Sequence, residues 1–291
     1  MNKSELQDHI TSLIVAELEK GTVPWHKGWR TAGLLPSNLI SGKAYRGINA
    51  LVLSIVGANY SSPYWLTYKQ AQQLGGSVKL GEKGTHITYY SKVIKKDKDT
   101  EDILGSFGLL KGYVVFNADQ CEGIQVPVSA ELSEEPVEIL PALESIKSGW
   151  NCPPIYYKEI TTPFYSPNED SITLPTLEQF ESAQEHAYTL AHEIIHSTGH
   201  QSRCDRWSKA EDKASQFGCK SYAREELVAE IGACMVLTMA GIEIDIKNSG
   251  AYIKSWLKAL NDDSTLIFKA AAKASAATSY ILGEVKEEAM A

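Results

Sequence analysis

The stretch "LAHEIIHSTGH" (Leu190–His200) contains the pattern His-Glu-x-x-His. His192 and His196 are four residues apart, so on a helix both imidazoles lie on the same face, one turn from each other. Two imidazoles at this spacing can bind one tetrahedral cation, and Glu193 between them can act as general base for a water molecule that the cation activates. The pattern therefore predicts a zinc site of the peptidase type, with His192 and His196 as ligands and Glu193 as the catalytic base.

The residues before this motif have the periodicity of an amphipathic helix. Thr176 and Gln179 stand at capping-box spacing, which predicts that the helix starts there, and Gly199 predicts its end. Upstream, "SITLP" (171–175) predicts a short strand that could align an extended peptide by backbone pairing. The motif is thus expected in the last turns of a long helix beside a strand.

The third metal ligand is not part of the motif itself. A catalytic zinc takes three protein ligands and keeps one position open. His200 follows His196 at a suitable spacing, but Gly199 is expected to end the helix before it. The longer peptidase pattern HExxHxxGxxH would require a third histidine where this chain has Ser202. A residue from a separate helix is therefore the better donor.

The acidic segment "REELVAE" (224–230) begins the next predicted helix and offers that donor. We expect Glu226 to be the third ligand, with Glu225 as the alternative, because helical phase alone separates the two. Glu230 lies one turn after Glu226 and is expected to orient a ligand imidazole through its other nitrogen. Small side chains on the same face would let this helix approach the histidine helix closely, namely those of Ala229 and Ala233.

Charge is distributed unequally along the chain, whose formal net charge is −8. Residues 1–125 contain 14 basic and 11 acidic residues, a net charge of +3, whereas residues 126–291 contain 14 and 25, a net charge of −11. Between residues 40 and 96, eight basic residues stand against the single acid Glu82. Such a split between the halves indicates a nucleic-acid-facing module joined to a second unit.

The basic interval 40–96 also contains seven aromatic residues. Basic groups neutralise phosphates and aromatic rings stack on unpaired bases, so the combination favours a single strand over a duplex. We therefore expect this half to bind a single-stranded nucleic acid, with contacts from Lys43, Tyr45, Arg46, Trp65, Tyr68, Lys69, Lys79 and Lys83.

The order of predicted elements indicates an α+β protein of two domains. Residues 126–142 are rich in Pro, Glu and Ser, which predicts a linker, or else a strand and loop within one domain. The predicted domains are then residues 1–125, a small sheet with helices, and residues 143–291, mainly helical with a small sheet. Helices of the first domain are predicted at 4–20, 45–59 and 65–76.

Other features of the sequence narrow the class of protein. No apolar run is long enough to cross a bilayer, and the start lacks the apolar core of a signal peptide, so we expect a cytoplasmic protein. The five cysteines are scattered without a CxxC pair, which argues against a disulfide framework or a cysteine-ligated zinc site.

Segments from both halves resemble the ArdC-type antirestriction proteins of conjugative plasmids. They are "SGKAYRGINALVL", "SPYWLTYKQAQQLGGSVKLGEKGTHITYY" and "YVVFNADQCEGI" in the first half, and "DSITLP", "YTLAHEIIHSTGHQSRCDR" and "YAREELVAEIGAC" in the second. The resemblance implies an N-terminal single-stranded DNA-binding domain, a C-terminal zincin-like metallopeptidase domain, and protection of incoming plasmid DNA from host restriction. It supports His192 and His196 as ligands, Glu193 as base, and one of Glu225 and Glu226 as third ligand.

A second class of function stays open from the sequence. The chain could instead be a regulatory metalloprotease that cleaves a host repressor or nuclease, with an N-terminal half that recognises protein rather than DNA. Zinc is the expected cofactor, and another divalent cation is the alternative.

Overall fold

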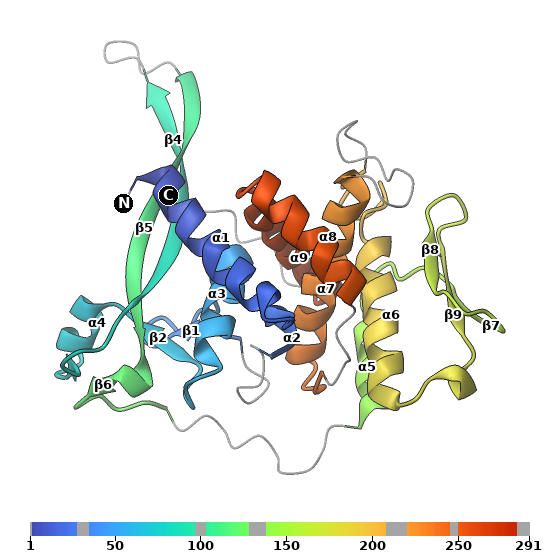
Figure 1. Ribbon diagram of the computed structural model, residues 1–291, viewed down its shortest axis with the longest axis horizontal. Coiled ribbons are helices and arrows are strands. Elements are labelled where there is room, and N and C mark those ends of the chain that lie inside the picture. The colour runs from blue at the N-terminus through green and yellow to red at the C-terminus, as the bar shows by residue number, and fades with distance from the viewer. Residues whose placement is uncertain are drawn as a thin grey trace.

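Helices and small sheets form two parts that meet in one apolar core (Figure 1). The structure, a computed structural model, describes residues 2–27, 35–96, 103–127, 138–207, 220–244 and 250–283. Its class is α+β with two domains, as the sequence predicts.

The N-terminal part consists of helices and short strands around one long strand pair. Its elements are α1 (Lys3–Glu19), α2 (Pro24–Lys27), β1 (Ser37–Asn38), α3 (Gly47–Gly57), β2 (Tyr64–Leu66), α4 (Tyr68–Gln73), β3 (Ser77–Val78), β4 (Thr85–Lys96), β5 (Ile103–Asn117), a 3-10 turn (Ala118–Gln120) and β6 (Cys121–Glu122). The C-terminal part is mainly helical. Its elements are α5 (Ile139–Lys147), β7 (Ile155–Lys158), β8 (Phe164–Ser166), β9 (Ser171–Pro175), a 3-10 turn (Leu177–Gln179), α6 (Ala183–Ser197), α7 (Lys220–Met239), α8 (Gly250–Asp262) and α9 (Leu266–Ile281).

Helix α1 starts with a capping box and turns its apolar stripe to the core. The Asn2 side chain accepts a hydrogen bond from the backbone N–H of Glu5 at 3.0 Å, and the Glu5 carboxylate accepts one from the N–H of Asn2 at 2.8 Å. Leu13 of this helix is 37% exposed. The buried members of the stripe are Leu6, Ile10, Ile14 and Leu18.

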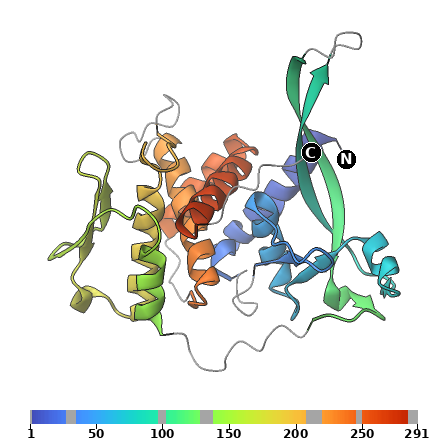
Figure 2. The same cartoon turned by 180° about the vertical axis from the view of Figure 1, so that it is seen from behind.

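An antiparallel ribbon of β4 and β5 dominates the N-terminal part. β5 also pairs with β2, and β2 pairs in parallel with β1, so the sheet has the order β1-β2-β5-β4. Helix α3 packs on the base of the ribbon, where Ile87 and Val115 are buried with Leu53. Beyond α1 the ribbon projects away from the helices (Figures 1 and 2).

The predicted helix 65–76 is wrong in its first residues. Trp65 and Leu66 belong to strand β2, and α4 starts only at Tyr68. Thr67 caps this helix with Gln70 in a capping box. Trp65 therefore stands in a strand, and its ring is buried with Leu53 of α3 and with Ile87 and Val115 of the ribbon.

The two parts share one continuous core. Helix α1 packs on α8, and α3 packs on α9. Trp25 of α2 contacts Trp256 of α8, with ring centroids 5.2 Å apart and both indoles buried. The two domains follow one another along the chain, but apolar side chains of both parts are buried against each other.

The predicted linker 126–142 needs a correction at its end. Residues 128–137 lie outside the described residues. Helix α5 begins at Ile139, so the last four residues assigned to the linker are helical. The same helix buries Leu143 and Ile146 in the core, which ties it to the C-terminal part.

The strand "SITLP" (β9) lies in the centre of a three-stranded sheet with the order β7-β9-β8. It pairs in parallel with β7 and antiparallel with β8, and all five of its residues are buried. The expectation that it aligns a peptide is wrong, because both of its backbone edges are already hydrogen-bonded. The free edges of this sheet belong to β7 and β8.

Helix α6 lies between this small sheet and α7 (Figures 1 and 2). It begins at Ala183, after the predicted start, because Ser182 is its N-cap and the Thr176 capping box closes only a 3-10 turn. A Cβ atom added at Gly232 of α7 would lie 2.8 Å from Cδ1 of Ile195. The small residues of α7 thus allow close packing on α6, including the fully buried Ala229 and Ala233.

Within the described ranges, no helix has both the length and the apolar composition that a membrane span requires.

Candidate metal centre

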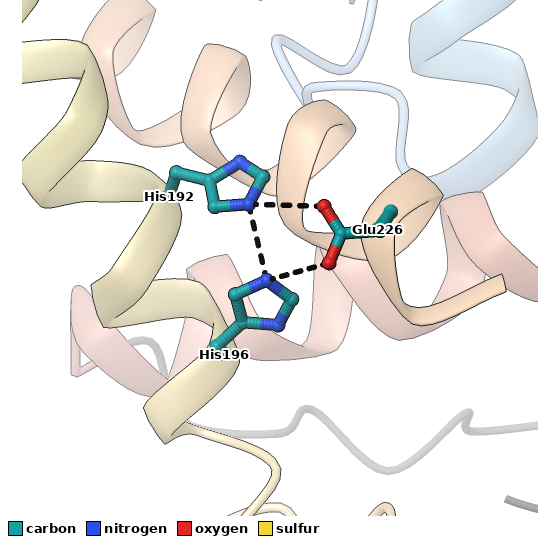
Figure 3. A group of neighbouring side chains, drawn as sticks. All are labelled: His192, His196 and Glu226. Carbon is teal, nitrogen blue, oxygen red and sulfur yellow. Dashed lines mark hydrogen bonds and ion pairs between the residues drawn. The ribbon is translucent and has the colours of Figure 1, made fainter. Parts of the chain in front are cut away.

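The facing sides of α6 and α7 bring three potential metal ligands together (Figure 3). His192 and His196 come from α6 and Glu226 from α7, and their ligand atoms all lie within 4.8 Å of one another. The two Nε2 atoms are 3.0 Å apart. Each of them lies 3.5 Å from one carboxylate oxygen of Glu226.

This spacing fits a bound divalent cation. In a tetrahedral zinc site with bonds of about 2.0–2.1 Å, neighbouring donor atoms are about 3.3 Å apart. The three measured separations, 3.0, 3.5 and 3.5 Å, lie on both sides of that value. Two unprotonated imidazole nitrogens at 3.0 Å repel each other unless a proton or a cation lies between them. Two imidazoles with one glutamate are a donor set that catalytic zinc sites use, and it leaves one position open.

Carboxylates control the protonation of both imidazoles in the absence of a cation. Burial by itself lowers the pKa of His196. Hydrogen bonds with Glu225 and Glu226 act in the opposite direction, and the net result is a pKa raised to about 10. Burial also opposes protonation of His192, and its hydrogen bond with Glu226 raises the pKa above the ordinary value. Because a cation has to displace such protons, metal binding here should release protons and depend on pH.

A second carboxylate from α7 lies against the outer nitrogen of each imidazole. Nδ1 of His192 is 3.5 Å from Oε1 of Glu230, and Nδ1 of His196 is 3.4 Å from Oε1 of Glu225. Contacts of this kind fix the tautomer and the ring orientation of a ligand imidazole. Glu230 thus occupies the position expected for it. Glu225 lies in the equivalent position on the other ring, and of the three glutamates Glu226 is the one that faces both Nε2 atoms.

Glu225 is held by a buried arginine. Arg206 donates from Nη2 to Oε1 of Glu225 at 2.5 Å and from Nε to Oε2 at 3.3 Å. Burial raises the pKa of Glu225, but Arg206 and His196 lower it to about 2. Arg206 also donates to the backbone oxygen of Ile195 at 2.8 Å, so one side chain caps the end of α6 and fixes the carboxylate beside it.

Glu230 is held by a tyrosine from α6. The hydroxyl of Tyr188 donates a short hydrogen bond to Oε2 of Glu230. Burial and the charge of Glu230 raise the pKa of Tyr188 well above its ordinary value, so the hydroxyl stays protonated and donates. Our sequence reasoning did not single out Tyr188 or Arg206. The signal for Tyr188 is its place one helical turn before His192, and Arg206 has no comparable signal because it lies beyond the helix end.

Glu193 is buried beside the two imidazoles, with 5% of its surface exposed. Its charge contributes to the raised pKa of both imidazoles, so the carboxylate lies close to the group of three. It stands next to His192 on α6 and contributes no ligand to the group of three.

His200 lies apart from this centre. Helix α6 ends at Ser197, as the prediction from Gly199 requires, and Nδ1 of His200 lies 2.8 Å from Oγ of Ser202. A Cβ atom at Gly199 would lie 2.4 Å from the indole of Trp207. The absence of a side chain at Gly199 therefore makes room for Trp207.

The residues expected to contact nucleic acid differ in how far they are exposed to solvent. Trp65 is a correction: it is 1% exposed and packs with Leu53 and Ile87, so a base cannot stack on its ring. Tyr45 is half-buried between core residues, and its hydroxyl accepts a hydrogen bond from Asn38 at 3.4 Å. The exposed members are Lys43, Arg46, Tyr68, Lys69, Lys79 and Lys83.

Two family models match the chain in this order. Residues 4–116 match the N-terminal domain of the anti-restriction factor ArdC, and residues 155–273 match the zincin-like metallopeptidases. The second match contains the whole group of three potential ligands. The zincin-like domain and the convergent donors together support a centre for a divalent metal.

Solved structures with the same fold cover nearly all of the chain. The metal-free crystal structure of the antirestriction protein ArdC from plasmid R388 is 39% identical, with a TM-score of 0.77 over 94% of this chain and 96% of that chain. The Mn(II)-bound structure of the same protein has a TM-score of 0.76 at 39% identity, over 95% and 97% of the two chains.

Three relatives have similar sequences. Two are named DNA primase TraC, from Escherichia coli, and are 36% identical over 96% of this chain, which spans only 27% and 20% of their lengths. An uncharacterized protein of Sinorhizobium fredii, y4eC, is 31% identical over 93% of this chain and 89% of its own length. From the two matched domains and the full-length similarity to solved ArdC structures, the chain belongs to the family of ArdC-type antirestriction proteins.

Proposed function

We propose that this protein binds single-stranded DNA through its N-terminal part and hydrolyses peptide bonds at a zinc centre in its C-terminal part, and that both serve to protect incoming plasmid DNA from host restriction. The convergence of His192, His196 and Glu226, with Glu193 beside them, carries the hydrolase half of the proposal. The match to the N-terminal domain of ArdC and the basic, aromatic interval 40–96 support the DNA half.

Zinc would be held by Nε2 of His192, Nε2 of His196 and a carboxylate oxygen of Glu226. When bound, zinc supplies Lewis acidity, which polarises a substrate carbonyl and lowers the pKa of water at the open position. The Glu193 carboxylate would accept a proton from the attacking water and return it to the leaving amine. Glu225 and Glu230 keep the two imidazoles aligned through their Nδ1 atoms.

The shared core would couple the two activities by position. Trp25 and Trp256 pack across the boundary between the parts, and α3 packs on α9. When this protein is bound to single-stranded DNA through its N-terminal part, the peptidase centre would be at high effective concentration beside other proteins that act on the same DNA.

Glu193→Gln tests the hydrolase half, because it removes the base and leaves all three proposed ligands in place. We expect zinc content and DNA affinity to be unchanged and cleavage of a casein or peptide-library substrate to fall by about 10²–10⁴-fold. Cleavage at the wild-type rate would refute the assigned role. Plasmid transfer into restricting and non-restricting recipients tests the link to protection: if the variant protects as well as the wild type, hydrolysis does not serve antirestriction.

A gel-shift assay tests the DNA half. We expect oligothymidylate to bind more tightly than a duplex of equal length, since unpaired bases are accessible to aromatic rings. Absence of binding, or preference for duplex, would instead favour a regulatory protease whose N-terminal part recognises protein.

A further inference from the structure

Three large aromatic side chains on the described part of the ribbon are exposed. Tyr89, Tyr90 and Tyr113 are 52%, 68% and 44% exposed. Tyr89 and Tyr113 contact each other edge to face, with ring centroids 6.0 Å apart. Lys111 stands directly opposite Tyr89 in the strand register and is exposed. Since directly opposed and alternate residues share a face, Tyr89, Lys111 and Tyr113 lie together on one face of the ribbon.

The ribbon is basic in an acidic protein. The strands β4 and β5 contain four lysines and no acidic residue, whereas the whole chain has a net charge of −8. The acidic residues of this hairpin are confined to the connection 97–102, which lies outside the described residues. A pocket beside the tyrosines adds a further basic group, because its lining includes Lys3 as well as Lys111 and Tyr113. The two lysines that the structure describes beside the tyrosines, Lys3 and Lys111, thus favour an anionic partner.

The position of these rings is fixed by the base of the ribbon. The Asn49 side chain on α3 accepts a hydrogen bond from the backbone N–H of Thr88 at 2.8 Å and donates one to the Thr88 oxygen at 2.6 Å. The strand is thus anchored at the residue before Tyr89, and Lys111 and Tyr113 lie beside the start of α1. Stacking surfaces that are already ordered lose little entropy when a ligand binds.

We infer that Tyr89, Lys111 and Tyr113 form a binding site for an unpaired nucleic-acid strand, in which the two rings stack on bases and the lysine contacts a phosphate. This inference rests on the proposed DNA-binding function and names the surface that performs it. A single strand fits because its bases expose the π-faces that tyrosines need, whereas a duplex buries them. In this inference the rings that stack on bases are those of Tyr89 and Tyr113 and not that of Trp65, which is buried.

Fluorescence anisotropy with a labelled oligothymidylate of about 20 nucleotides, long enough for several binding sites, tests the inference on the full-length protein. We expect the double variant Tyr89→Ala/Tyr113→Ala to bind at least about tenfold more weakly. Tyr89→Phe/Tyr113→Phe retains both rings and should bind like the wild type. Lys111→Ala should make the slope of log affinity against log salt concentration shallower by about 0.7, the loss of one phosphate contact.

The strand β7 offers a matched control. Tyr156 is half exposed, and Nζ of Lys158 lies 5.8 Å from the centre of its ring, so the pair resembles the proposed site in composition but lies on another sheet. Tyr156→Ala/Lys158→Ala should leave DNA affinity unchanged. Circular dichroism and thermal unfolding of all variants show whether the fold is retained, which is expected because the substituted side chains are exposed.

The outcomes separate this inference from the proposed function. If the wild type binds the single strand and the alanine double variant binds equally well, the site is wrong while DNA binding stands. The site is also wrong if the phenylalanine variant loses as much affinity as the alanine variant, or if only duplex binding is weakened. If the wild type does not bind single-stranded DNA at all, the proposed DNA-binding function fails and this site fails with it.

Discussion

Replacing Tyr188 by phenylalanine removes one hydroxyl from the network behind the metal centre and leaves the ring in place. That hydroxyl is the donor to Oε2 of Glu230, whose other oxygen lies 3.5 Å from Nδ1 of His192. The substitution creates no cavity of significant size, so its effect on metal binding should come from the lost restraint on Glu230. We therefore expect Tyr188→Phe to weaken metal binding even though Tyr188 is not a ligand.

Two magnitudes follow from this geometry. A hydrogen bond to a charged group contributes about 1.5–3 kcal/mol, so the metal-free protein should lose about that much free energy of unfolding. Loss of an outer partner of a ligand imidazole lowers metal affinity about 10–100-fold, which equals about 1.4–2.7 kcal/mol. Because Tyr188→Phe keeps the outer partner Glu230 and removes only the group that holds it, we expect the lower end of this range, about tenfold. Since a metal that binds only the folded state adds its binding free energy to stability, the variant should lose that additional amount when metal is saturating.

The chain contains a matched control in Tyr165. Its hydroxyl also donates to a carboxylate, Oδ1 of Asp170, at 2.7 Å, but this pair lies outside the metal centre. Asp170 keeps its two hydrogen bonds from Arg203, at 2.8 and 2.9 Å, when the hydroxyl is removed. We expect Tyr165→Phe to lower stability by a similar or smaller amount, equally with and without metal, and to leave metal affinity unchanged.

Urea unfolding with and without zinc, together with competition against a coloured chelator, measures both quantities. The reasoning is refuted if Tyr188→Phe binds zinc as tightly as the wild type. It is refuted equally if Tyr165→Phe loses as much zinc affinity as Tyr188→Phe, because the effect would then reflect general destabilisation of the domain.

Four further substitutions test other parts of the structure. Glu226→Gln should lower metal affinity more than about 100-fold and Glu225→Gln about 10–100-fold, by chelator competition; equal losses would contradict the choice between ligand and outer partner. Gly199→Ala places Cβ 2.4 Å from the Trp207 indole and should cost about 1–3 kcal/mol in urea unfolding, and an unchanged midpoint would refute the clash. Trp256→Ala should cost about 3–5 kcal/mol and shift one common transition, whereas separate unfolding of the two parts would show that they are independent.

Local patterns in the sequence were sufficient to predict part of the metal centre. The spacing of His192 and His196 places them on one face of any helix, and apolar periodicity indicated that α6 is a helix. The capping box of α1 was not among our predictions, although Asn2 and Glu5 stand at the right spacing. The start of α6 was misplaced because Thr176 and Gln179 form the same local hydrogen bonds around a 3-10 turn.

The remaining features depend on contacts between residues far apart in the chain. Trp65 is buried because β2 pairs with β5 and α3 packs over its ring, and β9 is central because β7 and β8 pair on either side of it. Neither pairing leaves a signal within the strand itself, because an apolar strand reads the same at an edge and in the centre. The predictions that Trp65 stacks on a base and that β9 aligns a peptide were therefore wrong.

The sequence by itself determined that two imidazoles and a carboxylate share a helix, and that basic and aromatic residues gather in the first half. The tertiary structure decided which glutamate meets both imidazoles. Glu225 and Glu226 are adjacent in sequence but point about 100° apart around α7, so only the packing of α7 on α6 directs Glu226 to the two Nε2 atoms and Glu225 to Nδ1 of His196. Helical periodicity fixes directions within one helix, and the rotation of one helix against another is fixed by the side chains packed between them.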